Sequence, residues 1–118
     1  MDELRTRRVA ESMREELSEL VRFELSDPRI QSVDVVDVIV SPDMRYADVL
    51  VLVSGTREEQ DAAIEGLRSA RHYLRRILMQ RIDLFRMPEL RFRPAAQLAP
   101  GLPLDRLKRR LRRGRARE

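Results

Sequence analysis

Two short runs of apolar, largely β-branched residues constrain the fold of this chain more than any other feature. Val33–Val40 consists of valine, isoleucine and aspartate, and Ala47–Val53 consists mainly of valine and leucine. Such side chains favour an extended backbone. The intervening Ser41–Tyr46, SPDMRY, contains a proline and an aspartate of the kind found in turns. A turn this short predicts an antiparallel hairpin, and the slip in alternation between Val35 and Val36 suggests a β-bulge.

Helical patterns flank the hairpin on both sides. From Leu4 to Leu25 apolar residues recur on one helix face, and SDPR at Ser26–Arg29 ends the helix because the residue before a proline avoids helical angles. After the hairpin, Thr56 and Glu59 form a capping-box pattern that begins one long helix or two. PELRFR, Pro88–Arg93, then reads as a third strand. This order predicts an α+β two-layer domain, with helices on one face of a three-stranded sheet.

The stretch Leu67–Arg81, LRSARHYLRRILMQR, combines leucines at helical spacing with arginines and the only histidine of the chain. On a helix the leucines lie on one face and the cations on another. A charged face is often simply solvated, but guanidinium groups also fit phosphates well. The candidate RNA-binding residues in and after this stretch are Arg68, Arg71, His72, Arg75, Arg76, Arg81, Arg86, Arg91 and Arg93.

Charge is distributed unevenly along a chain whose net charge is only +4. Val9–Leu67 has 5 basic and 14 acidic residues, whereas Arg68–Arg93 and Leu104–Glu118 each have 8 basic and 2 acidic residues. A molecule with an acidic half and a basic half is oriented by an anionic partner such as RNA. The alternative is a protein-interaction domain whose acidic half binds a basic protein while the arginines only solvate the surface.

Several other functional classes lack sequence support. The chain has no cysteine, so it has no disulfide framework and no thiolate metal site. No apolar run could span a membrane, and the start MDELRTRR is not a signal peptide. There is no nucleotide-binding loop, metal-ligand spacing or nucleophile–base pair. We therefore expect a cytoplasmic protein that is not an enzyme and has no cofactor, no metal and no membrane partner.

Two smaller features have competing interpretations. Asp34, Asp37 and Asp48 could form a cation site, but on strands they are more simply solvent-facing charges. His72 has neither a nucleophile nor a carboxylate in its own segment. We therefore expect it to contact a phosphate or a base edge, or to be a passive cap at the bend, and not to act as a general base. The corner at Asp27 is interpreted as a turn in which the aspartate bonds local backbone groups.

The last part of the chain has a different composition. A linker, AAQLAPGLP, precedes LDRLKRRLRR, whose leucines have helical spacing but which is too short to form a stable helix alone. We expect a folded domain over residues 1–94 and a flexible arginine-rich extension over residues 95–118. This extension could be an RNA arm, a membrane-surface helix or a solubilising tail, and an RNA arm is favoured.

Arginines at the two ends of the chain are further possible RNA contacts. The first helix begins with cations, which oppose the helix dipole and therefore hint at a separate use. Together with the tail, these possible RNA-binding residues are Arg5, Arg7, Arg8, Arg109, Arg110, Arg112 and Arg113.

Taken in order, several of these segments resemble the bacterial ribosome-binding factor A family. The matching pieces are RVAESMREELSELV, SDPR, SPDMRYADVLVLVS, LRSARHYLRRIL and PELRF, which together span about Arg5 to Phe92. The resemblance implies a type II KH-like fold. It also implies a ribosome assembly factor that binds the small (30S) subunit and its 16S rRNA in late maturation and 5′-end processing, with a role at low temperature. We expect a monomer. The alternative is a generic KH-like RNA-binding module without a ribosomal role.

The chain departs from the family pattern in two places. In the family an Ala-x-Gly segment forms a helix kink, and the matching residues here are Ala70, Arg71 and His72. Because a histidine gives the backbone less freedom than a glycine, a milder kink is predicted. After Phe92 the sequence differs from the family pattern, and no functional residue is carried over to that region.

Overall fold

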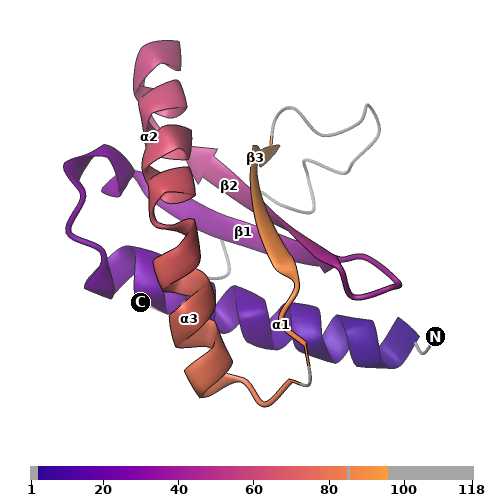
Figure 1. Cartoon of the computed structure of the whole chain (residues 1–118). Coiled ribbons are helices and arrows are strands. Elements are labelled where there is room, and N and C mark those ends of the chain that lie inside the picture. Colours follow the sequence, from indigo (N-terminus) through magenta and orange to yellow (C-terminus); the bar gives the residue numbers. More distant parts are fainter. Residues whose placement is uncertain (1–2, 85, 96–118) are drawn as a thin grey trace, which may run out of the picture.

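The computed structural model describes residues 3–84 and 86–95, and it confirms the predicted order of helices and strands (Figure 1). Helix α1, Glu3–Glu19, continues into a π-helical turn, Leu20–Glu24, and a 3₁₀ turn at Pro28–Ile30 follows. The remaining elements are β1 (Val33–Val40), β2 (Tyr46–Val53), α2 (Arg57–Ser69), α3 (Arg71–Arg81) and β3 (Glu89–Pro94).

The three strands form one mixed sheet in the order β1-β2-β3. The β1–β2 pair is the predicted antiparallel hairpin, and its register shifts between Val35 and Asp37, so that Val36 is the predicted bulge. Strand β3 runs parallel to β2, with Glu89 opposite Tyr46. Parallel neighbours need a crossover connection, and α2 and α3 provide it.

All three helices cover one face of the sheet. Met13 and Leu17 of α1, Leu67 of α2 and Leu74 and Leu78 of α3 are fully buried in a single core. The valines of β1 and β2 that point toward the helices, together with Leu90 and Phe92 of β3, complete this core. Figure 1 shows α3 following α2 and crossing α1. The leucine face predicted for the second helical region is therefore its core face.

The end of the first helical region differs from a regular helix. The N–H of Leu25 donates to the carbonyl of Leu20 over 3.1 Å, which is the spacing of a π-helical turn. Leu20 and Val21 in this turn are buried, while Phe23 is 73% exposed. The sequence pattern had treated this segment as regular helix up to Leu25.

The corner after the first helix packs against α2 at a glycine. The Asp27 carboxylate accepts a hydrogen bond from the backbone N–H of Arg29 (2.9 Å) and further hydrogen bonds from its guanidinium, which lowers the pKa of Asp27. A Cβ atom on Gly66 would lie 3.1 Å from Cγ2 of Ile30 and 3.2 Å from Oδ2 of Asp27. The turn interpretation of this corner is confirmed, and Gly66 allows its close approach to α2.

Replacing Gly66 with leucine should therefore destabilise the domain. The larger side chain would force the corner away from α2, and overpacking of this kind costs about 1–3 kcal/mol. Glu65→Leu adds the same side chain one residue earlier at an exposed position and is the control. We expect Gly66→Leu to lower Tm in thermal unfolding by several degrees relative to Glu65→Leu. Equal Tm values for the two variants would contradict the proposed packing.

Candidate nucleic-acid interface

The break between α2 and α3 positions the predicted cations. Ala70 ends one helix and begins the next with φ −87° and ψ 0°, and its N–H donates to the carbonyls of Gly66 and Leu67, both at 3.1 Å. Among the described non-glycine residues, a positive φ occurs only at Met44. The break thus forms with ordinary right-handed angles, and a histidine at position 72 does not prevent it.

The hairpin turn carries a basic and an aromatic residue to the same region. The Met44 N–H donates to the Ser41 carbonyl over 2.8 Å, and Met44 has a left-handed φ of 63°, which is costly for a residue other than glycine. The Asp43 carboxylate accepts from the Ser41 hydroxyl and from the Arg45 N–H, and these bonds lower the pKa of Asp43. This closed turn directs Arg45 and Tyr46 into the start of β2.

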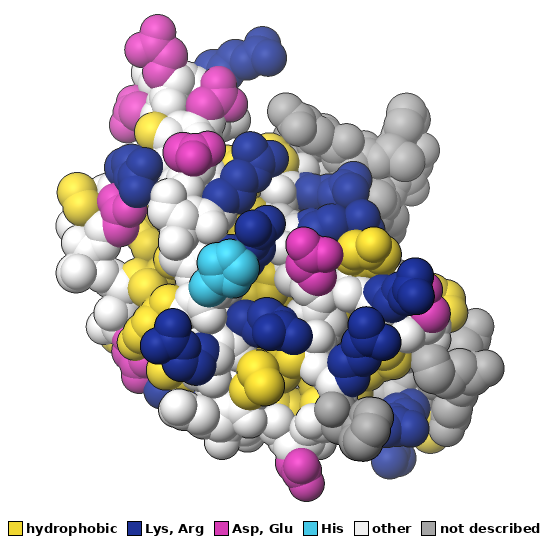
Figure 2. Space-filling model, viewed as in Figure 1, with side chains coloured by type: hydrophobic (Ala, Val, Ile, Leu, Met, Phe, Trp, Pro, Cys, Tyr) yellow, Lys and Arg dark blue, Asp and Glu magenta, His cyan; other side chains and the backbone are white. Residues whose placement is uncertain are grey.

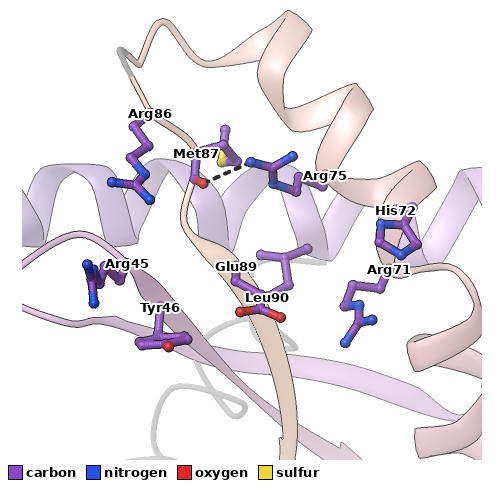
Figure 3. A pocket seen from close by; sticks show the side chains of 9 residues that line it. All are labelled: Arg45, Tyr46, Arg71, His72, Arg75, Arg86, Met87, Glu89 and Leu90. Atoms are coloured by element: carbon purple, nitrogen blue, oxygen red, sulfur yellow. Dashed lines mark hydrogen bonds between the residues drawn. The ribbon is translucent and has the colours of Figure 1, made fainter.

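The segment that leads into β3 is hydrogen-bonded to the hairpin turn and to α3. The N–H of Glu89 donates to the carbonyl of Arg45 over 2.8 Å. The guanidinium of Arg75, on α3, donates to the carbonyl of Met87 over 3.3 Å. The three segments line an open cavity of about 410 Å³ (Figure 3). Its lining residues are Arg45, Tyr46, Arg71, His72, Arg75, Arg86, Met87, Glu89 and Leu90.

The cavity is strongly electropositive. Figure 3 shows the side chains of Arg45, Arg71, Arg75 and Arg86 around it, with Glu89 as the single carboxylate in the lining. Within residues 3–84 and 86–95, no carboxylate pairs with Arg45, Arg71 or Arg86. Figure 2 shows basic side chains gathered around the histidine on this face of the molecule. Guanidinium groups without an internal counter-charge are available to phosphate oxygens.

Arg81 of the predicted set has a structural role. Its guanidinium pairs with Glu24 at 2.7 Å and with Glu16 at 3.1 Å, and these hydrogen bonds raise the pKa of Arg81. The pairs join the last turn of α3 to the first helical region. Arg81 is therefore held by protein carboxylates and lies outside the cavity lining.

Arg91 and Arg93 lie on the sheet face that points away from the helices. Asp48 of β2 lies 2.9 Å from Nε of Arg91 and 3.5 Å from Nε of Arg93. The Arg91 guanidinium also stacks on the Tyr46 ring, 4.3 Å from its centroid. These two arginines are thus partly neutralised, and Arg91 adjoins the cavity through Tyr46.

The other predicted residues do not line the cavity. Arg68 and Arg76 are exposed on α2 and α3, and Arg5, Arg7 and Arg8 are exposed on the first turns of α1. Arg109, Arg110, Arg112 and Arg113, with most of the predicted extension, lie outside the described residues.

Arg45 and Tyr46 were not among the residues predicted from the sequence. Arg45 belongs to the acidic half of the chain, and both residues border a turn. Only the parallel pairing of Tyr46 with Glu89 brings them to α3 and the segment before β3. A basic–aromatic pair at the start of a strand is the signal that could have indicated them.

Comparisons with known proteins agree on one family. The sequence profile of the family "Ribosome-binding factor A" matches residues 5–107. The ribosome-binding factor A of Solibacter usitatus is 44% identical over 118 residues, which is all of this chain and 96% of that protein.

Solved structures give the same relationship. The crystal structure of ribosome-binding factor A from Thermus thermophilus has a TM-score of 0.71 and 26% identity, covering 80% of this chain and 99% of that one. A homology model of the Thermus thermophilus protein, fitted into a cryo-EM map of a 30S–RbfA complex, has a TM-score of 0.55 and 28% identity, covering 74% of this chain and 97% of that one. These matches confirm the predicted KH-like α+β fold. Among the described helices, none is long and apolar enough to cross a membrane.

Asp48 should limit the affinity of this surface for polyanions. In Asp48→Asn, Arg91 and Arg93 lose their shared counter-charge, so the variant should elute from a heparin column at higher salt than the wild-type chain. Asp61→Asn makes the same change in net charge at an exposed position on α2 and is the control. If the two variants elute together, the effect is one of net charge and Asp48 does not restrain these arginines.

Proposed function

Because the chain belongs to the ribosome-binding factor A family, we propose that it binds the small (30S) ribosomal subunit and its 16S rRNA as an assembly factor. The relative from Thermus thermophilus, which shares the fold, has been fitted into a map of its complex with the 30S subunit. The proposal includes action in late maturation and 5′-end processing. It also includes a cytoplasmic location, a monomeric state and no enzymatic activity.

The observation that carries this proposal is the cavity where the hairpin, α3 and the segment before β3 meet. Arg45, Arg71 and Arg86 come from three different segments and have no carboxylate partner among the described residues. Helix α3 begins here, and its first turn has no acidic residue to offset these cations. Such a cluster suits the sugar–phosphate backbone of RNA.

Each lining residue has a distinct part in the proposed contact. Arg71 and Arg86 would bind phosphate oxygens, and exposed His72 would contact a phosphate or a base edge beside them. Arg75 is a positioning residue, since its bond to the Met87 carbonyl fastens α3 to the segment that carries Arg86. Tyr46, already stacked with Arg91, offers an aromatic surface at the edge of the site.

An assembly factor of this kind acts through differential affinity. A protein shifts an RNA folding equilibrium only if it binds one conformer more tightly than the other. A rigid cavity with cations from three segments requires a particular spacing of phosphates, and an incompletely folded RNA presents a different spacing. We propose that residues 1–94 form this rigid binding domain and that the extension at residues 95–118 adds an RNA arm.

Reversing single charges at the cavity tests the proposed surface. Arg71→Glu and Arg86→Glu, made separately, should each weaken co-sedimentation with small ribosomal subunits by about tenfold, because each replaces a phosphate contact by a repulsion. Arg57→Glu changes the net charge equally at the exposed start of α2 and should leave binding nearly unchanged. Circular dichroism spectra should be the same for all three variants. Full co-sedimentation of both cavity variants would exclude this surface.

The salt dependence of binding reports the phosphate contacts, and the choice of RNA partner distinguishes ribosomal recognition from a generic RNA-binding module. We expect the slope of log Kobs against log salt concentration to be smaller by about 1 in Arg71→Glu, because one fewer phosphate counterion is released. At low salt the wild-type chain should prefer small subunits to a random RNA duplex. Equal affinity for the two would favour the generic module and contradict the ribosomal role.

A further inference from the structure

The face of the sheet opposite the helices carries an apolar patch that none of the described helices covers. Val36, at the bulge of β1, and Ala95 are buried against each other and against Leu52 of β2. Leu50, on the same face of the central strand, is fully buried. The side chains of Met13, Leu67 and the other helical core residues belong to the cluster on the opposite face. The burial of this outer patch, Val36, Leu50, Leu52 and Ala95, is therefore not due to the described helices, which pack on the opposite face.

The described part of the chain ends on this patch. Ala95 follows β3 directly, is only 2% exposed, and belongs to the cluster that contains Val36. The 23 residues that remain, 96–118, therefore start at the patch itself. Neighbouring strands are about 5 Å apart, so β1 lies about 10 Å from β3. Three extended residues span about 10 Å, so Leu98 is already within reach of β1.

The composition of these residues complements the patch. Leu98, Leu102, Leu104, Leu107 and Leu111 supply apolar side chains, the last three at helical spacing. The 8 basic residues after Leu104 are complementary in charge to Asp34. Asp34 is exposed on β1, where it lies opposite Leu52 in the β1–β2 register. A short amphipathic helix is unstable alone in water and needs an apolar surface to form.

We infer that the C-terminal extension of this chain folds back across the outer face of the sheet, with Leu104, Leu107 and Leu111 packed over Val36, Leu50 and Leu52. In this arrangement the extension is a third layer of the domain. Its basic side chains then lie toward exposed Asp34, on the edge strand β1. The inference concerns the free protein and holds or fails independently of the ribosomal role.

Paramagnetic NMR on the full chain tests this contact. The chain has no cysteine, so Ile39→Cys, at an outer-face position that is 45% exposed, carries a single nitroxide label. We expect the amide signals of Leu104, Leu107 and Leu111 to lose intensity relative to the reduced, diamagnetic sample. A label at Phe23→Cys, which is 73% exposed in the π-helical turn on the helix side of the sheet, is the matched control and should cause a smaller loss of these signals.

Two further samples test whether the loss of amide intensity comes from packing of the extension within one molecule. Replacing Leu104, Leu107 and Leu111 with serine in the Ile39→Cys chain should restore full intensity to the amides of the extension. Mixing labelled chain with isotope-enriched wild-type chain should cause no loss, because the contact is within one molecule. Undiminished signals with the Ile39 label, equal loss with the Phe23 label, or loss that survives the serine replacements would overturn the inference. Loss in the mixed sample would also overturn it, because it would assign the face to a second copy of the chain.

Discussion

The parallel pairing of β2 with β3 is the constraint on which the candidate site depends. It places Tyr46 opposite Glu89 and ties the Glu89 N–H to the carbonyl of Arg45. A parallel pair requires a crossover, and here the crossover is α2 followed by α3. The helices therefore return the chain to the edge of β2 with Arg71 and Arg75 beside the hairpin turn. Without this pairing the three sources of positive charge would not meet.

The positions of the carboxylates divide the arginines into those with an internal ion pair and those left open to an anion. Glu16 and Glu24 hold Arg81, and Asp48 lies between Arg91 and Arg93, whereas the cavity lining has only Glu89 against four guanidinium groups. Exposed ion pairs add little stability, so the paired arginines are best understood as positioned side chains. The uneven pairing produces an open cationic surface at the cavity, on a chain whose net charge is small.

Local patterns allowed much of the fold to be predicted, because they depend on neighbouring residues. The hairpin, the bulge at Val36 and the separation of leucines from arginines on α2 and α3 are of this kind. The pairing of Arg81 with Glu16 and Glu24 joins residues 65 and 57 positions apart, and no periodicity indicates it. Arg45 was missed for the same reason, since its role depends on a strand that follows two helices. The π-helical turn was missed because its residues continue an ordinary helical pattern.

The break at Ala70 explains how the site tolerates a histidine where the family resemblance places a glycine. A glycine is required only where φ is positive or where a ligand must approach the backbone closely. Neither the φ of Ala70 nor that of His72 is positive, so the turn of the chain between α2 and α3 does not depend on position 72. What a glycine alone would offer is close backbone contact with a phosphate. At this position a side chain stands instead, and the guanidinium groups of Arg71 and Arg86 line the same cavity. Recognition at this surface therefore depends on side-chain donors, and single arginine substitutions should affect it more than changes in the backbone at the break.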